Sequence, residues 1–129
     1  MKVRKQKMYQ IDAFSGTVFG GNPAAVCVLE DWWTDELMQS VASENNLSET
    51  AFVVQREKDF EIRWFTPMNE EALCGHATLA SAHVIFNYYE YTKDTISFYS
   101  RHSGNLSVTK DKDLLTLDFP ADNITDVEP

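Results

Sequence analysis

The hydrophobic pattern changes several times along the chain, and most of its regular stretches are short. Seven of them are rich in β-branched and aromatic side chains and are bounded by charged or turn-forming residues, which is typical of β-strands. They cover residues 8–14, 24–30, 50–55, 60–66, 95–99, 105–109 and 114–119. A Gly-Gly-Asn-Pro turn at 20–23 follows the first strand, and the charged intervals 56–59 and 110–113 predict two hairpins.

Two longer stretches have the periodicity of helices. The first begins at a Thr34 N-cap, continues with Asp35 and Glu36 and ends near Asn45, with an apolar face on one side only. The second covers 75–89, and small residues recur along it at helical spacing: Ala77, Ala80, Ser81 and Ala82. We expect the first helix to cover a sheet and the second to be enclosed, which predicts an α+β domain whose curved sheet or barrel wraps a central helix.

Composition and charge narrow the classes of partner. The chain has 129 residues, 43% of them hydrophobic, which suffices for one compact domain. Its 11 basic and 20 acidic residues give a net charge of -9, which disfavours nucleic acids and anionic membrane surfaces as partners. No apolar run follows the basic first seven residues or could cross a bilayer, so we expect a cytoplasmic protein.

The cysteine and histidine spacing matches no metal or redox motif. Cys27 and Cys74 lack the C-x-x-C spacing, and we expect both to be reduced. His83 shares a helix face with His76, but no Glu or Cys completes a metal-ligand set there, and we interpret His83 as structural. Because dinucleotide-binding and P-loop motifs are also missing, the sequence predicts neither a metal nor a cofactor.

The start of the second helix is a candidate binding site. Backbone N–H groups in the first turn of a helix lack intrahelical partners and favour an anion such as a carboxylate. Gly75 would let a ligand approach the backbone, and His76 is a candidate proton donor or acceptor. A simple capping role for Cys74 and Gly75 explains the same residues equally well. Helical spacing puts Cys74 and His76 about 200 degrees apart, which argues against a thiolate–imidazole pair.

Glu49 is the second candidate, in the loop between the first helix and a buried strand. A glutamate held against apolar walls has a raised pKa, which suits a general acid or base near neutral pH. Most glutamates are solvated, and the residues alone favour solvation or capping over catalysis here.

Several motifs in order resemble the signatures of the PhzF-like phenazine-biosynthesis family. They are IDAF at 11–14, GNPAAV at 21–26, NLSETAF at 46–52, RWFTP at 63–67, LCGHAT at 73–78, SG at 103–104 and LDFP at 117–120. The resemblance implies the diaminopimelate epimerase-like fold, in which two pseudo-symmetric lobes each wrap a sheet around a helix and bind the ligand between the helix starts. The chain has the length of the N-terminal lobe alone.

The resemblance also implies roles for individual residues. The type enzyme isomerises trans-2,3-dihydro-3-hydroxyanthranilate by a proton shift without a cofactor, and the glutamate that matches Glu49 is its acid/base. By the same match, His76 contacts the substrate, and Ser48 and Gly75 line the pocket. Cys74 stands where related epimerases keep a catalytic thiol, and near a helix start its pKa is expected to be low. The substrate is then a small carboxylate, and whether Glu49 or Cys74 moves the proton stays open.

The second lobe of the family supplies a D-x-A-T-G-S-A-like motif that this sequence lacks. We therefore expect residues 1–120 to form the N-terminal lobe and the acidic residues 121–129 to form a tail or the start of a linker. The expected function is half of a cofactor-independent isomerase, incomplete without a second lobe. The chain is then either a fragment or split gene product that needs a separate C-terminal lobe, or one copy of a homodimer. The alternative is a non-catalytic half-domain that dimerises or binds a small anion.

Overall fold

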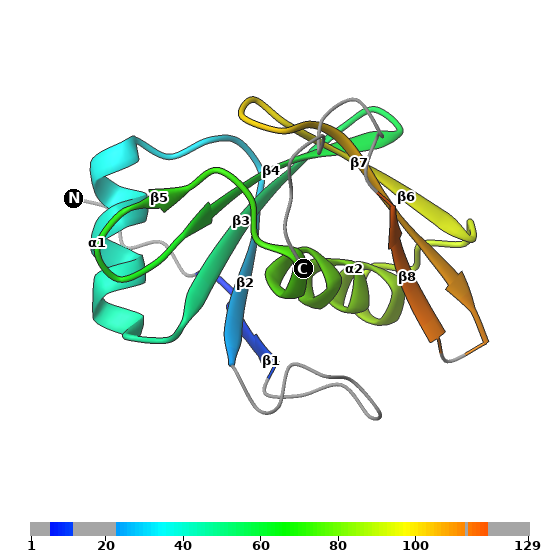
Figure 1. Cartoon of the computed structure of the whole chain (residues 1–129), viewed down its shortest axis with the longest axis horizontal. Coiled ribbons are helices and arrows are strands. Elements are labelled where there is room, and N and C mark those ends of the chain that lie inside the picture. The colour runs from blue at the N-terminus through cyan, green and yellow to red at the C-terminus, as the bar shows by residue number, and fades with distance from the viewer. Residues whose placement is uncertain (1–5, 12–22, 113, 119–129) are drawn as a thin grey trace, which may run out of the picture.

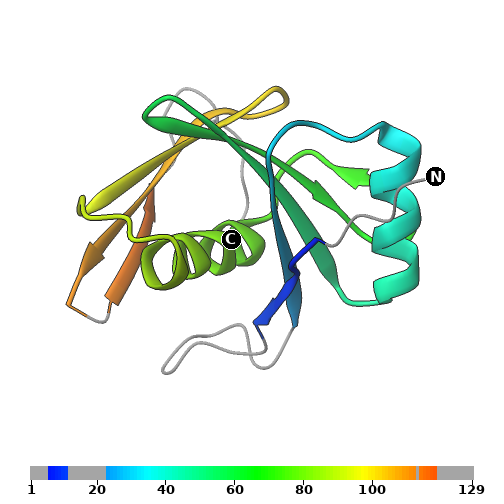
Figure 2. The ribbon, with the colours of Figure 1, turned by 180° about the vertical axis from the view of Figure 1, so that it is seen from behind.

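The computed structural model describes residues 6–11, 23–112 and 114–118. One curled sheet wraps around the helix α2, and the helix α1 lies on the outside of the same sheet (Figure 1, Figure 2). The elements are β1 (Tyr9–Ile11), β2 (Ala24–Leu29), α1 (Asp35–Asn45), β3 (Glu49–Arg56), β4 (Asp59–Phe65), β5 (Glu70–Glu71), α2 (Gly75–Tyr88), β6 (Thr95–Ser100), β7 (Gly104–Asp111) and β8 (Leu114–Asp118). The predicted α+β class and the sheet around a central helix are confirmed.

The strand order is β1-β2-β3-β4-β6-β7-β8, with β5 paired to β4 at the side. The two predicted hairpins form, since β3 pairs antiparallel with β4 and β7 with β8. Two pairs are parallel, β2 with β3 and β4 with β6, and in each case a helix makes the crossover that parallel strands require. Alternating patterns did not predict which neighbours would be parallel.

The main core lies between the inner face of the sheet and α2. Small side chains on the helix let the strands approach, and Ala77, Ala80 and Ala82 are almost fully buried there. Larger residues of the strands, such as Trp64 and Phe98, fill the space around them. The sequence interpretation of the second helix as enclosed is therefore confirmed.

A second core lies on the outer face of the sheet, beneath α1. Met38 and Ala42 of the helix are buried against Phe52 and Phe65 of the sheet. The predicted N-cap is present, because the backbone N–H of Leu37 donates to Thr34 Oγ1 at 3.1 Å. This helix covers one face of the sheet, as predicted.

Some predictions fall partly outside the described residues. Of the strand expected over 8–14, Tyr9–Ile11 forms β1 and 12–14 lie outside the described residues. Residues 20–22 of the turn expected at 20–23 lie outside them as well. The domain boundary at 120 and the tail 121–129 also lie outside them. No helix of the described part is long and apolar enough to cross a membrane. The strand β5 was not predicted, because two consecutive glutamates carry no strand signal.

Candidate active site

Glu49 and Cys74 come together at the end of the sheet where β3 and α2 both begin. We call this end of the sheet the mouth. Glu49 is the first residue of β3, opposite Ala24 of β2, and not a loop residue as expected. It alternates with Ala51 and Val53, which belong to the core around α2, so its side chain is on the inner face of the sheet. Cys74 directly precedes α2 and is its N-cap residue.

Glu49 is buried, so the expectation of a solvated side chain is wrong. Only 8% of the residue is exposed. Among the described residues, Glu49 Oε1 has no hydrogen-bond partner. Burial, with a smaller contribution from the negative charge of Glu71, raises the pKa of Glu49 from 4.5 to about 7, while a hydrogen bond with the Cys74 side chain opposes the shift. The group can therefore gain or lose a proton near neutral pH.

Cys74 and His76 lie closer than the helical spacing predicts. Cys74 Sγ is 3.4 Å from His76 Nδ1, so the expected separation of 200 degrees is wrong. The reason is that Cys74, as the N-cap, has extended backbone angles of φ -144 and ψ 107, to which helical geometry does not apply. Cys74 occupies the N-cap position of α2, as the capping alternative expects, without a side-chain capping hydrogen bond.

The Cys74 thiol is protonated at neutral pH, contrary to the expectation of a lowered pKa. Burial raises its pKa to about 12, and the negative charges of Glu49 and Glu71 act in the same direction. The backbone amides of Ala77 and His76 lower it, as a helix start should, but this effect is smaller than that of burial. The thiol is thus a hydrogen-bond donor in this mouth and not a thiolate.

The other predicted residues border the same mouth with different exposure. Burial lowers the pKa of His76, so the imidazole is neutral at neutral pH. Ser48 precedes Glu49 and is exposed, and Gly75 is half-buried in the first turn of α2. A Cβ added to Gly75 would meet Leu117 Cδ2 at 3.5 Å, which is an ordinary contact, so packing within the described lobe does not require glycine there.

Glu71 is a residue of this mouth that the sequence analysis missed. It pairs with Trp64 across β4 and β5, and Trp64 pairs with Ala51 across β3 and β4, so the three side chains lie on the inner face. Its negative charge acts on both Glu49 and Cys74. The sequence does show a carboxylate three residues before the candidate Cys74. Which face of the sheet that carboxylate occupies depends on the register of β5 on β4, which the sequence does not give.

Hydrogen bonds from the core fix the residue that begins the helix. Trp64 Nε1 donates to Thr78 Oγ1 at 3.0 Å, and Thr78 Oγ1 in turn donates to the backbone oxygen of Cys74 at 2.8 Å. The bond between Trp64 and Thr78 is buried, where polar groups bind strongly and are costly to leave unpaired. The orientation of Cys74 is therefore tied to the packing of the core.

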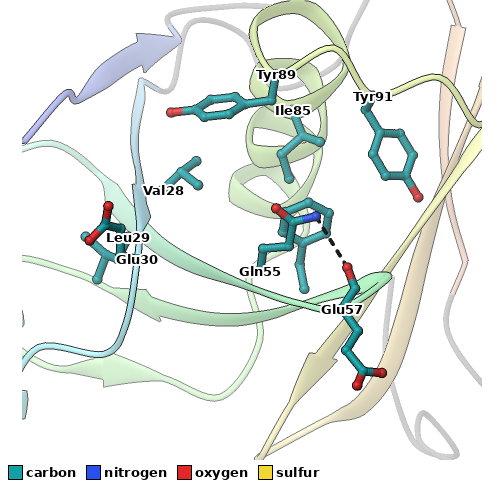
Figure 3. A pocket seen from close by; sticks show the side chains of 9 residues that line it. Val28, Leu29, Glu30, Gln55, Glu57, Ile85, Tyr89 and Tyr91 are labelled. Carbon is teal, nitrogen blue, oxygen red and sulfur yellow. Dashed lines mark hydrogen bonds between the residues drawn. The ribbon is translucent and has the colours of Figure 1, made fainter.

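One cavity of the described part of the chain lies apart from this mouth. This cavity, of about 540 Å³, opens near the other end of α2, where Ile85, Tyr89 and Tyr91 line it together with Gln55 and Glu57 (Figure 3). It contains none of the predicted site residues. In the described part of the chain, no three His, Cys, Asp or Glu side chains are grouped as metal ligands.

Comparison with known proteins agrees with the fold and motifs. A family model described as phenazine biosynthesis-like protein matches residues 11–126. An uncharacterized isomerase of Pseudomonas aeruginosa is 55% identical over 115 residues, which are 89% of this chain and 44% of that protein. A PhzF-family phenazine biosynthesis protein from Enterococcus faecalis, solved by crystallography, has a TM-score of 0.77 and 54% identity and covers 83% of this chain and 41% of that one.

The fold likeness extends further than the sequence likeness. A Pseudomonas aeruginosa protein named as a predicted epimerase has a TM-score of 0.64 at 20% identity, over 84% of this chain and 40% of that one, which speaks for the fold alone. The chain spans less than half the length of each of these relatives. The chain therefore belongs to the phenazine biosynthesis-like (PhzF) family and has the fold of one lobe of its diaminopimelate epimerase-like architecture.

Proposed function

We propose that this chain is the N-terminal lobe of a cofactor-independent isomerase, in which Glu49 shifts a proton on a small carboxylate substrate. The observation that carries the proposal is the state of Glu49, which is buried at the mouth with a pKa of about 7. A general acid or base works best when its pKa lies near the operating pH. The curated relative from Pseudomonas aeruginosa is named an isomerase, which agrees with this class of reaction.

The proposed step moves one proton and leaves the atom count unchanged. Ionised Glu49 takes a proton from one carbon of the substrate, and neutral Glu49 returns it to another carbon. The Cys74 thiol donates a hydrogen bond that stabilises the ionised form between these events. We assign the substrate carboxylate to the backbone N–H groups that begin α2, with His76 and Gly75 beside it and Ser48 at the exposed rim.

The proposed site needs groups that the described residues do not supply. The described mouth offers carboxylates and a helix start on one side only, and the relatives are more than twice as long. A C-terminal lobe, on the same polypeptide or on a separate one, is the first candidate for the missing half. A second copy of this chain is the other, because two copies could place two helix starts against one cleft.

The proposal is tested by supplying the missing half. The remaining segment of the Enterococcus faecalis relative is expressed separately and mixed with this chain, and dihydro-hydroxyanthranilate and amino acids are incubated in D₂O. We expect deuterium to enter the substrate only when both halves are present. If both halves fold and associate and no exchange occurs with any of these substrates, the isomerase proposal is wrong.

The alternative is a half-domain that binds a small anion without turnover, which the helix start alone would support. It predicts that isothermal titration detects carboxylate or phosphate binding and that no exchange occurs with either partner. The isolated chain is expected to be a dimer, because a lone lobe leaves apolar surface without a partner. Light scattering at micromolar concentration should give twice the mass of 14.7 kDa, whereas a monomer at all concentrations would contradict the homodimer.

A further inference from the structure

A partly buried ion pair lies on the opposite face of the sheet from the proposed site. Arg63 Nε donates to Glu70 Oε2 and Arg63 Nη2 to Glu70 Oε1, both at 2.8 Å, which makes the pair bidentate. Arg63 is only 8% exposed, and its Nη1 also donates to Asp35 at the start of α1, at 3.0 Å. Its guanidinium lies over the Trp32 ring, 5.6 Å from the centroid. This arginine is thus fixed in one orientation.

The ion pair stabilises a strand, β5, that is too short to be stabilised by its own ladder hydrogen bonds. The strand β5 has only the two residues Glu70 and Glu71, and they pair with Phe65 and Trp64 of β4. Successive residues of a strand point to opposite faces, so Glu70 faces Arg63 and α1 while Glu71 faces the mouth. A two-residue ladder provides few hydrogen bonds, and the bidentate pair with Arg63 adds two side-chain hydrogen bonds of 2.8 Å to β5.

Further hydrogen bonds hold the chain on both sides of β5. The Ser103 hydroxyl of the β6–β7 turn donates to the backbone oxygen of Ala72 at 2.6 Å. Thr66 Oγ1 accepts from the backbone N–H of Asn69 at 3.0 Å and closes the turn before β5. In addition to these contacts, Glu70, the neighbour of Glu71, forms an ion pair with the buried Arg63.

We propose that Arg63 and Glu70 are positioning residues, which hold Glu71 near Glu49 from the far side of the sheet. The groups whose charge or hydrogen bonding acts on Glu49 are Glu71 from β5 and Cys74 from the start of α2, with the neutral His76 next to Cys74. Cys74 is tied to the core through Thr78, whereas Glu71 is the neighbour of Glu70 on the strand that the ion pair anchors. The inference rests on the proposed role of Glu49 and explains how the fold maintains the proton affinity of that group.

The test is a carbon-13 NMR titration of the Glu49 carboxyl group in the full chain, which needs no substrate. In the wild type we expect a midpoint near 7. Glu71→Gln should lower it by about one pH unit, because it removes a like charge. Glu70→Gln leaves the Glu71 charge in place, yet it should produce a downward shift of similar size. In the double variant, Glu70→Gln should add little to the shift caused by Glu71→Gln, since it acts through that residue.

The matched control is Asp35→Asn, which removes the other carboxylate on Arg63 and keeps the bidentate pair. It should leave the Glu49 midpoint unchanged. The proposal is overturned if Glu70→Gln does not move the midpoint, if its shift is the same with and without Glu71, or if Asp35→Asn moves it equally. Glu70→Asp replaces Glu70→Gln if the latter unfolds; it keeps the charge but shortens the reach, and a downward shift supports positioning while no shift overturns it.

Failure of the proposed function has a different signature in the same titration. A wild-type midpoint near 4.5 would remove the basis of both the proposed function and the positioning role. A raised wild-type midpoint that is insensitive to Glu70 overturns the positioning role alone.

Discussion

Burial of ionised Glu49 lowers the free energy of unfolding by an amount that depends on pH. Comparison of wild type with Glu49→Gln measures this amount. The folded pKa is about 7, against an ordinary value of 4.5. Below pH 4.5 the carboxyl is protonated in both the folded and the unfolded chain, and its burial costs no ionisation energy. As the pH rises toward 7, the unfolded chain releases the proton and the folded chain keeps it, so the folded state loses stability. Above pH 7 the loss is complete.

The magnitude follows from the difference between the two pKa values. A shift from 4.5 to about 7, at about 1.4 kcal/mol for each pH unit, corresponds to about 3 kcal/mol. Glutamine has nearly the same size and does not ionise, so the variant avoids this loss. The variant also loses the charge-assisted hydrogen bond between Glu49 and Cys74. This loss makes the increase in the free energy of unfolding smaller.

The assay is urea unfolding of both proteins between pH 5 and pH 8.5, compared at each pH. The difference between the free energies of unfolding of Glu49→Gln and wild type should grow by about 2 to 3 kcal/mol in favour of the variant across this range. Titrations elsewhere in the chain cancel in the difference. A difference that does not change with pH would refute the reasoning, because it would mean that Glu49 ionises in the folded chain as it does in water.

Three further expectations concern other parts of the lobe. Both Cys27 and Cys74 have pKa values raised to about 12, so iodoacetamide at pH 8 should alkylate the native chain on the order of 100-fold more slowly than the urea-unfolded chain; comparable rates would contradict the burial of the thiols. Met38→Ala should lower the free energy of unfolding in urea by about 2 to 5 kcal/mol, because Met38 of α1 is fully buried against the sheet. Leu37→Ala, at a position 46% exposed, should change it by about 0.5 kcal/mol or less. Thr34→Ala should cost about 1 kcal/mol by removing the N-cap bond, and an unchanged midpoint would show that water replaces it.

Local patterns predicted the elements well because each was determined by its own residues. The small side chains from Ala77 to Ala82 indicate close packing wherever the helix is placed, and the structure encloses it. Thr34 caps α1 through a bond within its own first turn. The hairpin of β3 and β4 follows from two apolar runs around a charged turn. None of these features needs knowledge of distant contacts.

The features that failed or were missed depend on positions outside the local pattern. The approach of Cys74 to His76 depends on the extended backbone at the N-cap, which helical spacing cannot describe. The burial of Glu49 follows from its pairing with β2 and its place beside α2, and the residues around it in sequence gave no such signal. The face of Glu71 is set by a two-residue register on β4. In each case tertiary packing determines the chemistry of a residue whose identity alone is ambiguous.

In the proposed mechanism Glu49, and not Cys74, moves the proton. The direct measurement is the rate of solvent deuterium incorporation at pH 7 by the assembly of this chain with a second lobe, for wild type, Glu49→Gln and Cys74→Ser. Because Cys74 is protonated with a pKa of about 12 and acts only as a hydrogen-bond donor, Cys74→Ser should retain most of the exchange. Glu49→Gln should lose about 100-fold or more. Exchange that survives in Glu49→Gln and disappears in Cys74→Ser would contradict the account and assign the proton transfer to the thiol.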